Sequence, residues 1–311
     1  MSCTNPRPAI LVPSNLSKTG QRIKFINPLE CKTYPELKAK YGDMYIDIPC
    51  GKCLNCIEQR TKAWAIRCTL EAAEYEDNCF ITLTYNDTCL PKNGLCKSDV
   101  FKFIKRLRNK FGSGIRYYGC GEYGSSLKTE RPHYHAILFN FWPKDAEVVA
   151  RNPYGGFYYR SKELQALWPF GFVSIGEVSY NSCAYVARYC QKKLKDDGIV
   201  GKNPEFSFMS RRPGIGEAYF RKHFDSLVAT DRIYAHINEN FSFQSFRYFD
   251  KLLERIDPDK LQELKDQRIR NSGVNVASEL LSRNIPAMEH YLIYQEQLIG
   301  EKYNRLKRRL D

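Results

Sequence analysis

The sequence lacks any uninterrupted apolar run of about 18 residues, the minimum for a helix that crosses a membrane. Its first residues, MSCTNPR, also lack a charged start followed by a long apolar run, so no signal peptide is expected. No internal repeat and no low-complexity tract interrupts the chain. These absences argue against membrane-embedded, secreted and repeat architectures. The 12 Cys are therefore expected to be thiols or metal ligands rather than disulfides.

Acidic residues are too few to balance the basic ones. Asp and Glu total 35 against 48 Lys and Arg, which leaves a formal charge of +13. This surplus favours polyanion partners, since each phosphate contact releases condensed counterions; a basic surface that binds nothing is the alternative. Aromatic residues make up 14% of the chain and interleave with the basic ones, which suits unpaired bases. We therefore expect a nucleic-acid partner.

The order of predicted elements indicates the fold class. Periodicity and propensity predict a strand, a helix, three strands and a second helix, at residues 79–85, 98–111, 115–123, 132–141, 172–178 and 179–195. Ser98 is the expected N-cap of the first helix. This order predicts an α+β fold with a central antiparallel sheet and helices on one face.

The 311 residues suit a catalytic core with appendages. Residues 1–75 form a Cys-rich N-terminal region that includes a helix over 57–75, residues 76–200 hold the core, and residues 201–311 are mostly helical. Asp257 and Pro258 mark the start of a new helix, because Asp caps a helix and Pro suits its first position.

His133 and His135 are candidate metal ligands. Side chains alternate along a strand, so both imidazoles point to one face, about 7 Å apart. If the preceding strand forms a hairpin with theirs, Glu122 reaches the same ion, and open coordination positions remain for a substrate phosphate. Two half-buried histidines with ordinary hydrogen bonds and a solvated Glu122 are the alternative. Glu177 is a weaker competitor for the carboxylate role.

The helix after the fourth strand carries candidate nucleophiles. Tyr185 and Tyr189 are four residues apart and share one helix face, with Lys192 and Lys193 close to it. A Tyr oxygen can attack phosphorus and form a covalent ester, and a metal or Lys nearby favours the phenolate. The alternative is two core aromatics on an amphipathic helix.

A third candidate site is the run Cys50, Cys53 and Cys56. Thiolates at this spacing suit a structural zinc, and Cys31 or Cys68 is available as the fourth ligand. Reduced cysteines that pack a turn, or an iron–sulfur cluster, are the alternatives.

Three segments then resemble a known family. Residues 80–85 (FITLTY), 131–139 (RPHYHAILF) and 185–193 (YVARYCQKK) are similar, in this order, to the three motifs of rolling-circle replication initiators of the HUH (His-hydrophobic-His) endonuclease superfamily. The run PCGKC at 49–53 and the length most resemble the initiators of gokushovirus-type microviruses, which are small single-stranded DNA phages.

The resemblance implies a mechanism and a fold with the tyrosine helix across the sheet from the metal. His133 and His135 would hold Mg²⁺ or Mn²⁺, with Glu122 as third ligand. One tyrosine would nick a single strand at the phage origin and keep the 5′ phosphate, while the 3′ hydroxyl primes a host polymerase working with a host helicase in the bacterial cytoplasm. The second tyrosine would cut the regenerated origin, and the displaced strand would be joined into a circle. Lys192 or Lys193 would orient the phosphate or the leaving group.

The sequence departs from the family in one respect. Many relatives have a third His ligand, whereas the other histidines here, His223, His236 and His290, lie far from the motif. Two other functions are kept as alternatives: a non-catalytic, zinc-stabilised nucleic-acid-binding protein, and a two-tyrosine transposase that cuts transposon ends.

Overall fold

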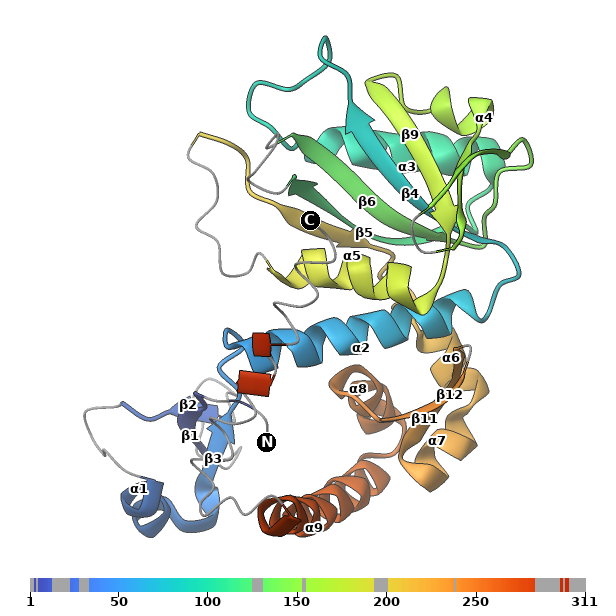
Figure 1. Ribbon diagram of the computed structural model, residues 1–311. Coiled ribbons are helices and arrows are strands. Elements are labelled where there is room, and N and C mark those ends of the chain that lie inside the picture. Colours follow the sequence, from blue (N-terminus) through green and yellow to red (C-terminus); the bar gives the residue numbers. More distant parts are fainter. Residues whose placement is uncertain are drawn as a thin grey trace. The chain divides into compact units, whose positions relative to one another are not determined.

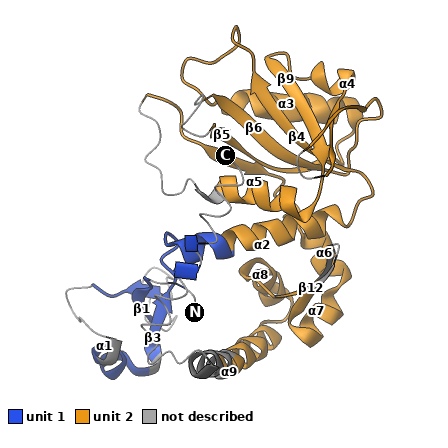
Figure 2. Cartoon of the chain, in the orientation of Figure 1, with its two compact units in different colours: residues 1–59, 275–311 blue, residues 60–274 orange. Residues whose placement is uncertain are grey.

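The computed structural model describes residues 3, 5–12, 23–27, 34–124, 131–152, 155–192, 201–237, 239–282, 297–298 and 300–301. The chain divides into two compact units, residues 1–59 with 275–311, and residues 60–274 (Figure 2). The first division falls inside helix α2, Leu54–Ala72. The domain boundaries expected near residues 75 and 200 stay predictions.

The first unit contains a small antiparallel sheet of order β2-β1-β3. Its elements are β1 (Arg7–Leu11), β2 (Ile23–Phe25), α1 (Tyr34–Tyr41), the 3-10 turn η2 (Gly42–Met44) and β3 (Tyr45–Ile48). Its described core consists of buried Ile26, Leu37 and Tyr45, against which Ile10 and Tyr41 pack. So few buried side chains give this sheet little hydrophobic stabilisation.

The second unit is built around a seven-stranded sheet in which every pairing is antiparallel (Figure 1). The strand order is β10-β5-β6-β4-β9-β8-β7. The strands are β4 (Asn78–Tyr85), β5 (Arg116–Tyr123), β6 (Pro132–Phe139), β7 (Glu147–Arg151), β8 (Phe157–Arg160), β9 (Gly171–Glu177) and β10 (Phe206–Met209). The α+β class and the antiparallel sheet are therefore confirmed.

Helices cover both faces of this sheet, so the prediction of helices on one face was wrong. Helix α3 (Lys97–Phe111) packs Phe103 and Leu107 on the face formed by Ile81, Leu83 and neighbouring residues. Helix α5 (Tyr180–Lys192) packs Val186 and other residues on the opposite face, together with part of α2. The physical reason is in β6, where seven of the eight residues are buried and neither face is polar enough to meet water.

Sequence reasoning found the central strands but not the edges. β7, β8, the short helix α4 (Lys162–Gln165) and β10 were not predicted. The N-cap of α3 is Cys96 rather than Ser98, and no side chain caps this helix. Ser98 instead donates its hydroxyl hydrogen bond to Asp99.

A second core follows the sheet in the same unit. Its elements are α6 (Glu217–Lys222), α7 (Phe224–Thr230), β11 (Arg232–Ile237), β12 (Glu239–Gln244), α8 (Arg247–Ile256) and α9 (Pro258–Ser282). Ile66 and Leu70 of α2 pack into it. Helices predominate after residue 200, as predicted, and α9 begins at Pro258. Among the described helices, none combines the length and apolarity needed to cross a membrane.

Candidate active site

The hairpin of β5 and β6 brings the predicted carboxylate and histidines together. Its register places Glu122 directly opposite His133. Oxygen Oε1 of Glu122 lies 2.9 Å from Nε2 of His133 and 3.0 Å from Nε2 of His135. One ligand atom from each of the three side chains lies within 4.8 Å of the other two. The three residues therefore form one group that could hold a metal ion.

The outer nitrogens of both imidazoles are held by neighbours. Nδ1 of His133 lies 3.0 Å from the carbonyl oxygen of Arg131, and Nδ1 of His135 lies 3.0 Å from Oγ1 of Thr82. A carbonyl only accepts, so Nδ1 of His133 carries the hydrogen. In the neutral ring Nε2 then turns a lone pair toward the Glu122 carboxylate. A cation between them resolves this repulsion, and such an arrangement is typical of metal-ligating histidines.

Glu122 is ionised in this setting. The carboxylate is 2% exposed. Burial raises its pKa, but the hydrogen bonds and positive charge of His133 and His135 outweigh burial, so the pKa of Glu122 lies below its ordinary value. A buried carboxylate beside two imidazoles is a donor set that fits a divalent cation.

Helix α5 places both predicted tyrosines over His135. The ring centroids of Tyr185 and Tyr189 are 4.6 Å apart, and those of His135 and Tyr185 are 5.3 Å apart. The centroid of Tyr189 lies 6.0 Å from that of His135. Burial raises the pKa of the Tyr185 phenol, and the charges of Tyr189 and Glu122 raise it further. Burial also raises the pKa of Tyr189. Both phenols therefore need an activating cation to act as nucleophiles.

Two residues of this site were missed by sequence reasoning. Thr82 pairs with His135 in the β4–β6 register, and Phe80 stacks on His135 with ring centroids 5.6 Å apart. Both lie in the strand segment 80–85 and alternate onto the face of His135. The alternation was readable, but the register that selects Thr82 as the partner of Nδ1 was not.

The remaining candidates are not brought to the site. Glu177 pairs with Cys79, at the opposite end of β4 from Thr84, which pairs with His133. The hydroxyl of Tyr159 donates to Glu177 instead. Lys192 ends α5, but its side chain is not among those described, and Lys193 lies outside the described residues. Their proposed roles stay predictions.

The Cys run gains a ligand that the sequence did not indicate. Sulfurs of Cys3, Cys50, Cys53 and Cys56 all lie within 4.8 Å of one another. Of the two candidates for a fourth ligand, Cys68 is buried against the central sheet with Tyr118 and Cys183, so it belongs to another core. Cys31 lies outside the described residues.

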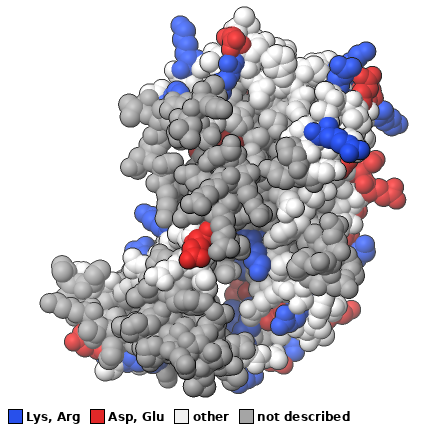
Figure 3. All heavy atoms as spheres, in the orientation of Figure 1, with Lys and Arg blue, Asp and Glu red and all other residues white. Residues whose placement is uncertain are grey.

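Basic side chains do not gather into one patch on the face drawn in Figure 3. Among the described residues of that face, Lys and Arg stand at several separate places with Asp and Glu among them. The positive charge of the chain is therefore dispersed on this face.

Comparison with known proteins places the site within a matched region. The family described by the replication-associated protein ORF2 matches residues 78–194, which include β4, β5, β6 and α5. The chain is 33% identical to the replication-associated protein ORF2 of Spiroplasma virus 4, over 100% of this chain and 97% of that protein. It is 32% identical to the replication-associated protein ORF4 of Chlamydia phage 1, over 76% of this chain and 60% of the relative. It is also 32% identical to the replication-associated protein VP4 of Bdellovibrio phage phiMH2K, over 76% of each. No solved structure matches.

Proposed function

The chain belongs to the family of phage replication-associated proteins, and on that premise we propose that it initiates rolling-circle replication by nicking one DNA strand at the phage origin. The single observation that carries the proposal is the convergence of Glu122, His133 and His135 beneath the tyrosine pair of α5. A metal-ligand group beside two phenols suits phosphoryl transfer to tyrosine.

The protein's own residues would hold and orient the reacting groups. Glu122, His133 and His135 would bind Mg²⁺ or Mn²⁺, which supplies charge neutralisation at the scissile phosphate. Thr82 and the carbonyl of Arg131 would fix the imidazole rings through their Nδ1 atoms. Lys192 or Lys193 would orient the phosphate or the leaving oxygen. Because burial keeps the phenols protonated at neutral pH, the attacking tyrosine must lose its proton as it reacts.

The chemistry would be an exchange of esters. The phenol oxygen of Tyr185 or Tyr189 bonds to phosphorus while the bond from phosphorus to the 3′ oxygen breaks. The 5′ phosphate stays on the enzyme, and the 3′ hydroxyl primes a host polymerase behind a host helicase in the bacterial cytoplasm. The other tyrosine then cuts the regenerated origin. The new 3′ hydroxyl attacks the first phosphotyrosine and closes the circle, without ATP, because each step exchanges one phosphodiester for another.

A covalent adduct is the direct test. The protein is incubated with single-stranded genomic DNA of its phage and Mg²⁺ or Mn²⁺, and the mixture is run on a denaturing gel. We expect a protein–DNA adduct that is abolished when Tyr185 and Tyr189 are both changed to Phe. Tyr158→Phe is the matched control, since Tyr158 is an exposed residue of β8 outside the site.

The outcomes separate the alternatives. No adduct, or an adduct unchanged in the double Phe variant, contradicts the proposal. DNA binding without cleavage, insensitive to His133→Ala and His135→Ala, would indicate a non-catalytic binding protein. Cleavage confined to transposon ends would indicate a transposase.

A further inference from the structure

The four thiols of the first unit form a second group suited to a metal. We propose that Cys3 completes a structural zinc site with Cys50, Cys53 and Cys56, distinct from the replication chemistry. The sulfurs of Cys3 and Cys53 are 3.9 Å apart. Zinc–sulfur bonds of about 2.3 Å in a tetrahedron place neighbouring sulfurs about 3.8 Å apart. A disulfide would need about 2.05 Å, and none of the described cysteines forms one.

The chain around these thiols is shaped to stabilise thiolates. Gly51 adopts a φ of +74°, which turns the backbone back on itself between Cys50 and Cys53. The Cys50 amide donates to the Cys3 sulfur at 3.2 Å, and the Cys53 amide donates to the Cys50 sulfur at 3.2 Å. The Lys52 amide also donates to Cys50, at 3.4 Å. Backbone N–H groups that converge on sulfur in this way support negative charge there.

The sheet of the first unit explains how Cys3 reaches the others. β1 pairs with β3 antiparallel, with Arg7 opposite Ile48. Continued past the strand ends, this register brings Cys3 next to the segment 50–53. Cys56 comes from the first turn of α2, which begins at Leu54. The metal would thus join the ends of three elements, β1, β3 and α2.

A closed four-thiolate site leaves no coordination position for substrate, so its role is structural. The first unit needs such a link, because its described core has only three buried side chains, Ile26, Leu37 and Tyr45. Small cores are commonly completed by a metal whose binding energy adds to folding. The zinc is therefore expected to stabilise the fold of this unit and to play no part in the ester exchange.

Zinc content and sulfur count test the proposal on the full chain. Elemental analysis of the purified wild-type protein should find one zinc per chain, retained through dialysis against Mg²⁺ buffer. Zinc-edge X-ray absorption should show four sulfurs near 2.3 Å, a distance that is about the usual one for zinc and thiolate. Cys3→Ser should lose most of the zinc, whereas Cys89→Ser, a half-buried thiol outside the group, should keep it.

The absorption measurement uses the wild-type protein, so it decides the matter even if Cys3→Ser fails to fold. Three sulfurs and one nitrogen or oxygen would overturn the role of Cys3. Iron in place of zinc, or no bound metal, would overturn the zinc site itself. Full zinc retention in a folded Cys3→Ser protein would also contradict it.

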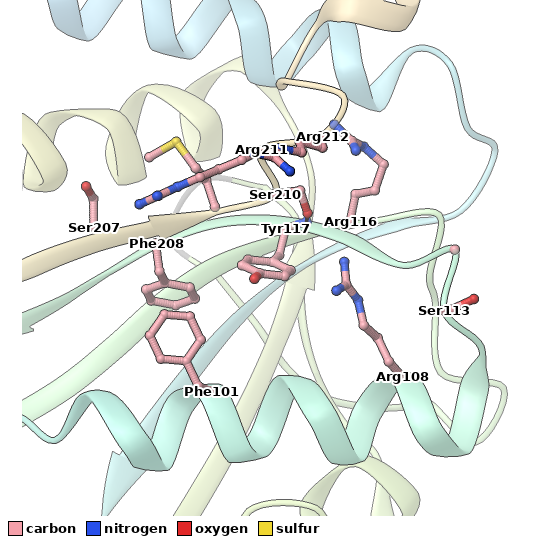
Figure 4. A pocket seen from close by; sticks show the side chains of 12 residues that line it. Phe101, Arg108, Ser113, Arg116, Tyr117, Ser207, Phe208, Ser210, Arg211 and Arg212 are labelled. Carbon is pink, nitrogen blue, oxygen red and sulfur yellow. Dashed lines mark hydrogen bonds between the residues drawn. The ribbon is translucent and has the colours of Figure 1, made fainter.

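An independent feature is the pocket of about 860 Å³ at the β10 edge of the large sheet (Figure 4). Its lining includes four arginines and no carboxylate: Arg108, Arg116, Arg211 and Arg212. Phe101, Tyr117 and Phe208 also line it, and Phe101 is 46% exposed. Guanidinium groups beside open aromatic rings suit a nucleotide, with phosphate on the arginines and a base on a ring.

We infer that this pocket holds a nucleotide unit of single-stranded DNA, an inference that rests on the proposed function. Arg116 contacts Glu71, and Arg108 donates to the carbonyl of Ile115. Arg211 and Arg212 are exposed and form no ion pair among the described residues, so they are available to phosphate. The pocket lies about 20 Å along β5 from Glu122, by the rise of a strand, so DNA bound here would be held well away from the cut.

Salt-dependent binding tests the pocket in the double Phe variant of Tyr185 and Tyr189, where no adduct can form. Arg211→Ala with Arg212→Ala should weaken binding of a single-stranded oligonucleotide about tenfold and flatten the salt dependence by about 0.7 for each phosphate that the protein no longer neutralises. The matched control, Arg255→Ala on α8, should change neither. Unchanged affinity and slope would overturn the inference, as would loss of free deoxynucleotide binding alone. An intact adduct in the otherwise wild-type protein carrying both arginine changes would show that the proposed function stands regardless.

Discussion

Glu122 and His133 face each other across the β5–β6 hairpin, with Oε1 and Nε2 2.9 Å apart. Since successive residues alternate faces, a slip of one residue would send Glu122 to the α3 side of the sheet. The register of one hairpin therefore supplies the carboxylate of a site in which no third histidine lies near the other two in the sequence.

The charge of Glu122 should be essential to metal binding. Glu122→Gln keeps the shape but removes the charge, and we expect single-turnover nicking to fall at least about 100-fold, with a matching loss of Mn²⁺ affinity. Glu177→Gln is the control and should be silent, because Glu177 lies at the other end of β4. Equal activity of the two variants would contradict the assignment of Glu122.

Thr82 should tune the site without touching the ion. Thr82→Val removes the hydroxyl that pairs with Nδ1 of His135 and should lower metal affinity about tenfold, measured by Mn²⁺ titration of nicking. Thr84→Val removes a hydroxyl from the same strand face, where it donates to the carbonyl of Phe172, and should have little effect. Indistinguishable titration curves for the two variants would count against this role.

Nicking should accelerate with pH. Burial raises the pKa of Tyr185 and of Tyr189, so the protonated phenol predominates across the neutral range. Below its pKa, the phenolate fraction grows about tenfold with each pH unit. Single-turnover rates at saturating Mg²⁺ should therefore rise from about pH 6 to about pH 9. A rate that is flat or falls over this range would show that phenol ionisation does not limit the reaction.

Tyr134, between the two histidines, should matter for stability rather than chemistry. Its side chain is fully buried on the other face, where its hydroxyl accepts from the Cys96 amide and pairs with the hydroxyl of Tyr85. Tyr134→Phe leaves that amide without its partner and should cost about 1–3 kcal/mol of unfolding free energy. Urea denaturation checks the cost, and nicking by the folded variant should match the wild type. A large loss of activity at unchanged stability would be the opposite of this expectation.

Local patterns were sufficient to predict the centre of the site. Alternation put His133 and His135 on one face, and the four-residue spacing put Tyr185 and Tyr189 on one side of a helix. The structure shows both arrangements. These relations depend on residues close in sequence, which is why spacing alone is informative.

Relations between distant segments were not predictable in the same way. Cys3 joins Cys50 only through the pairing of β1 with β3, and β10 joins the sheet beside β5 from far along the chain. The cover on both faces of β6 was also missed, because a continuous apolar strand reads alike whether one helix or two lie against it. Strand order and edge pairing are set by tertiary packing, which no local window contains.

The most direct test of the account is to identify the residue that carries DNA. The nicking reaction is trapped, the adduct is digested with protease and nuclease, and peptides are mapped by mass spectrometry. We predict a nucleotide attached through its 5′ phosphate to Tyr185 or Tyr189 of α5. Cleaved DNA with a free 5′ phosphate and no modified peptide, or a modification on any other residue, would contradict the claim that this site transfers a phosphate to tyrosine.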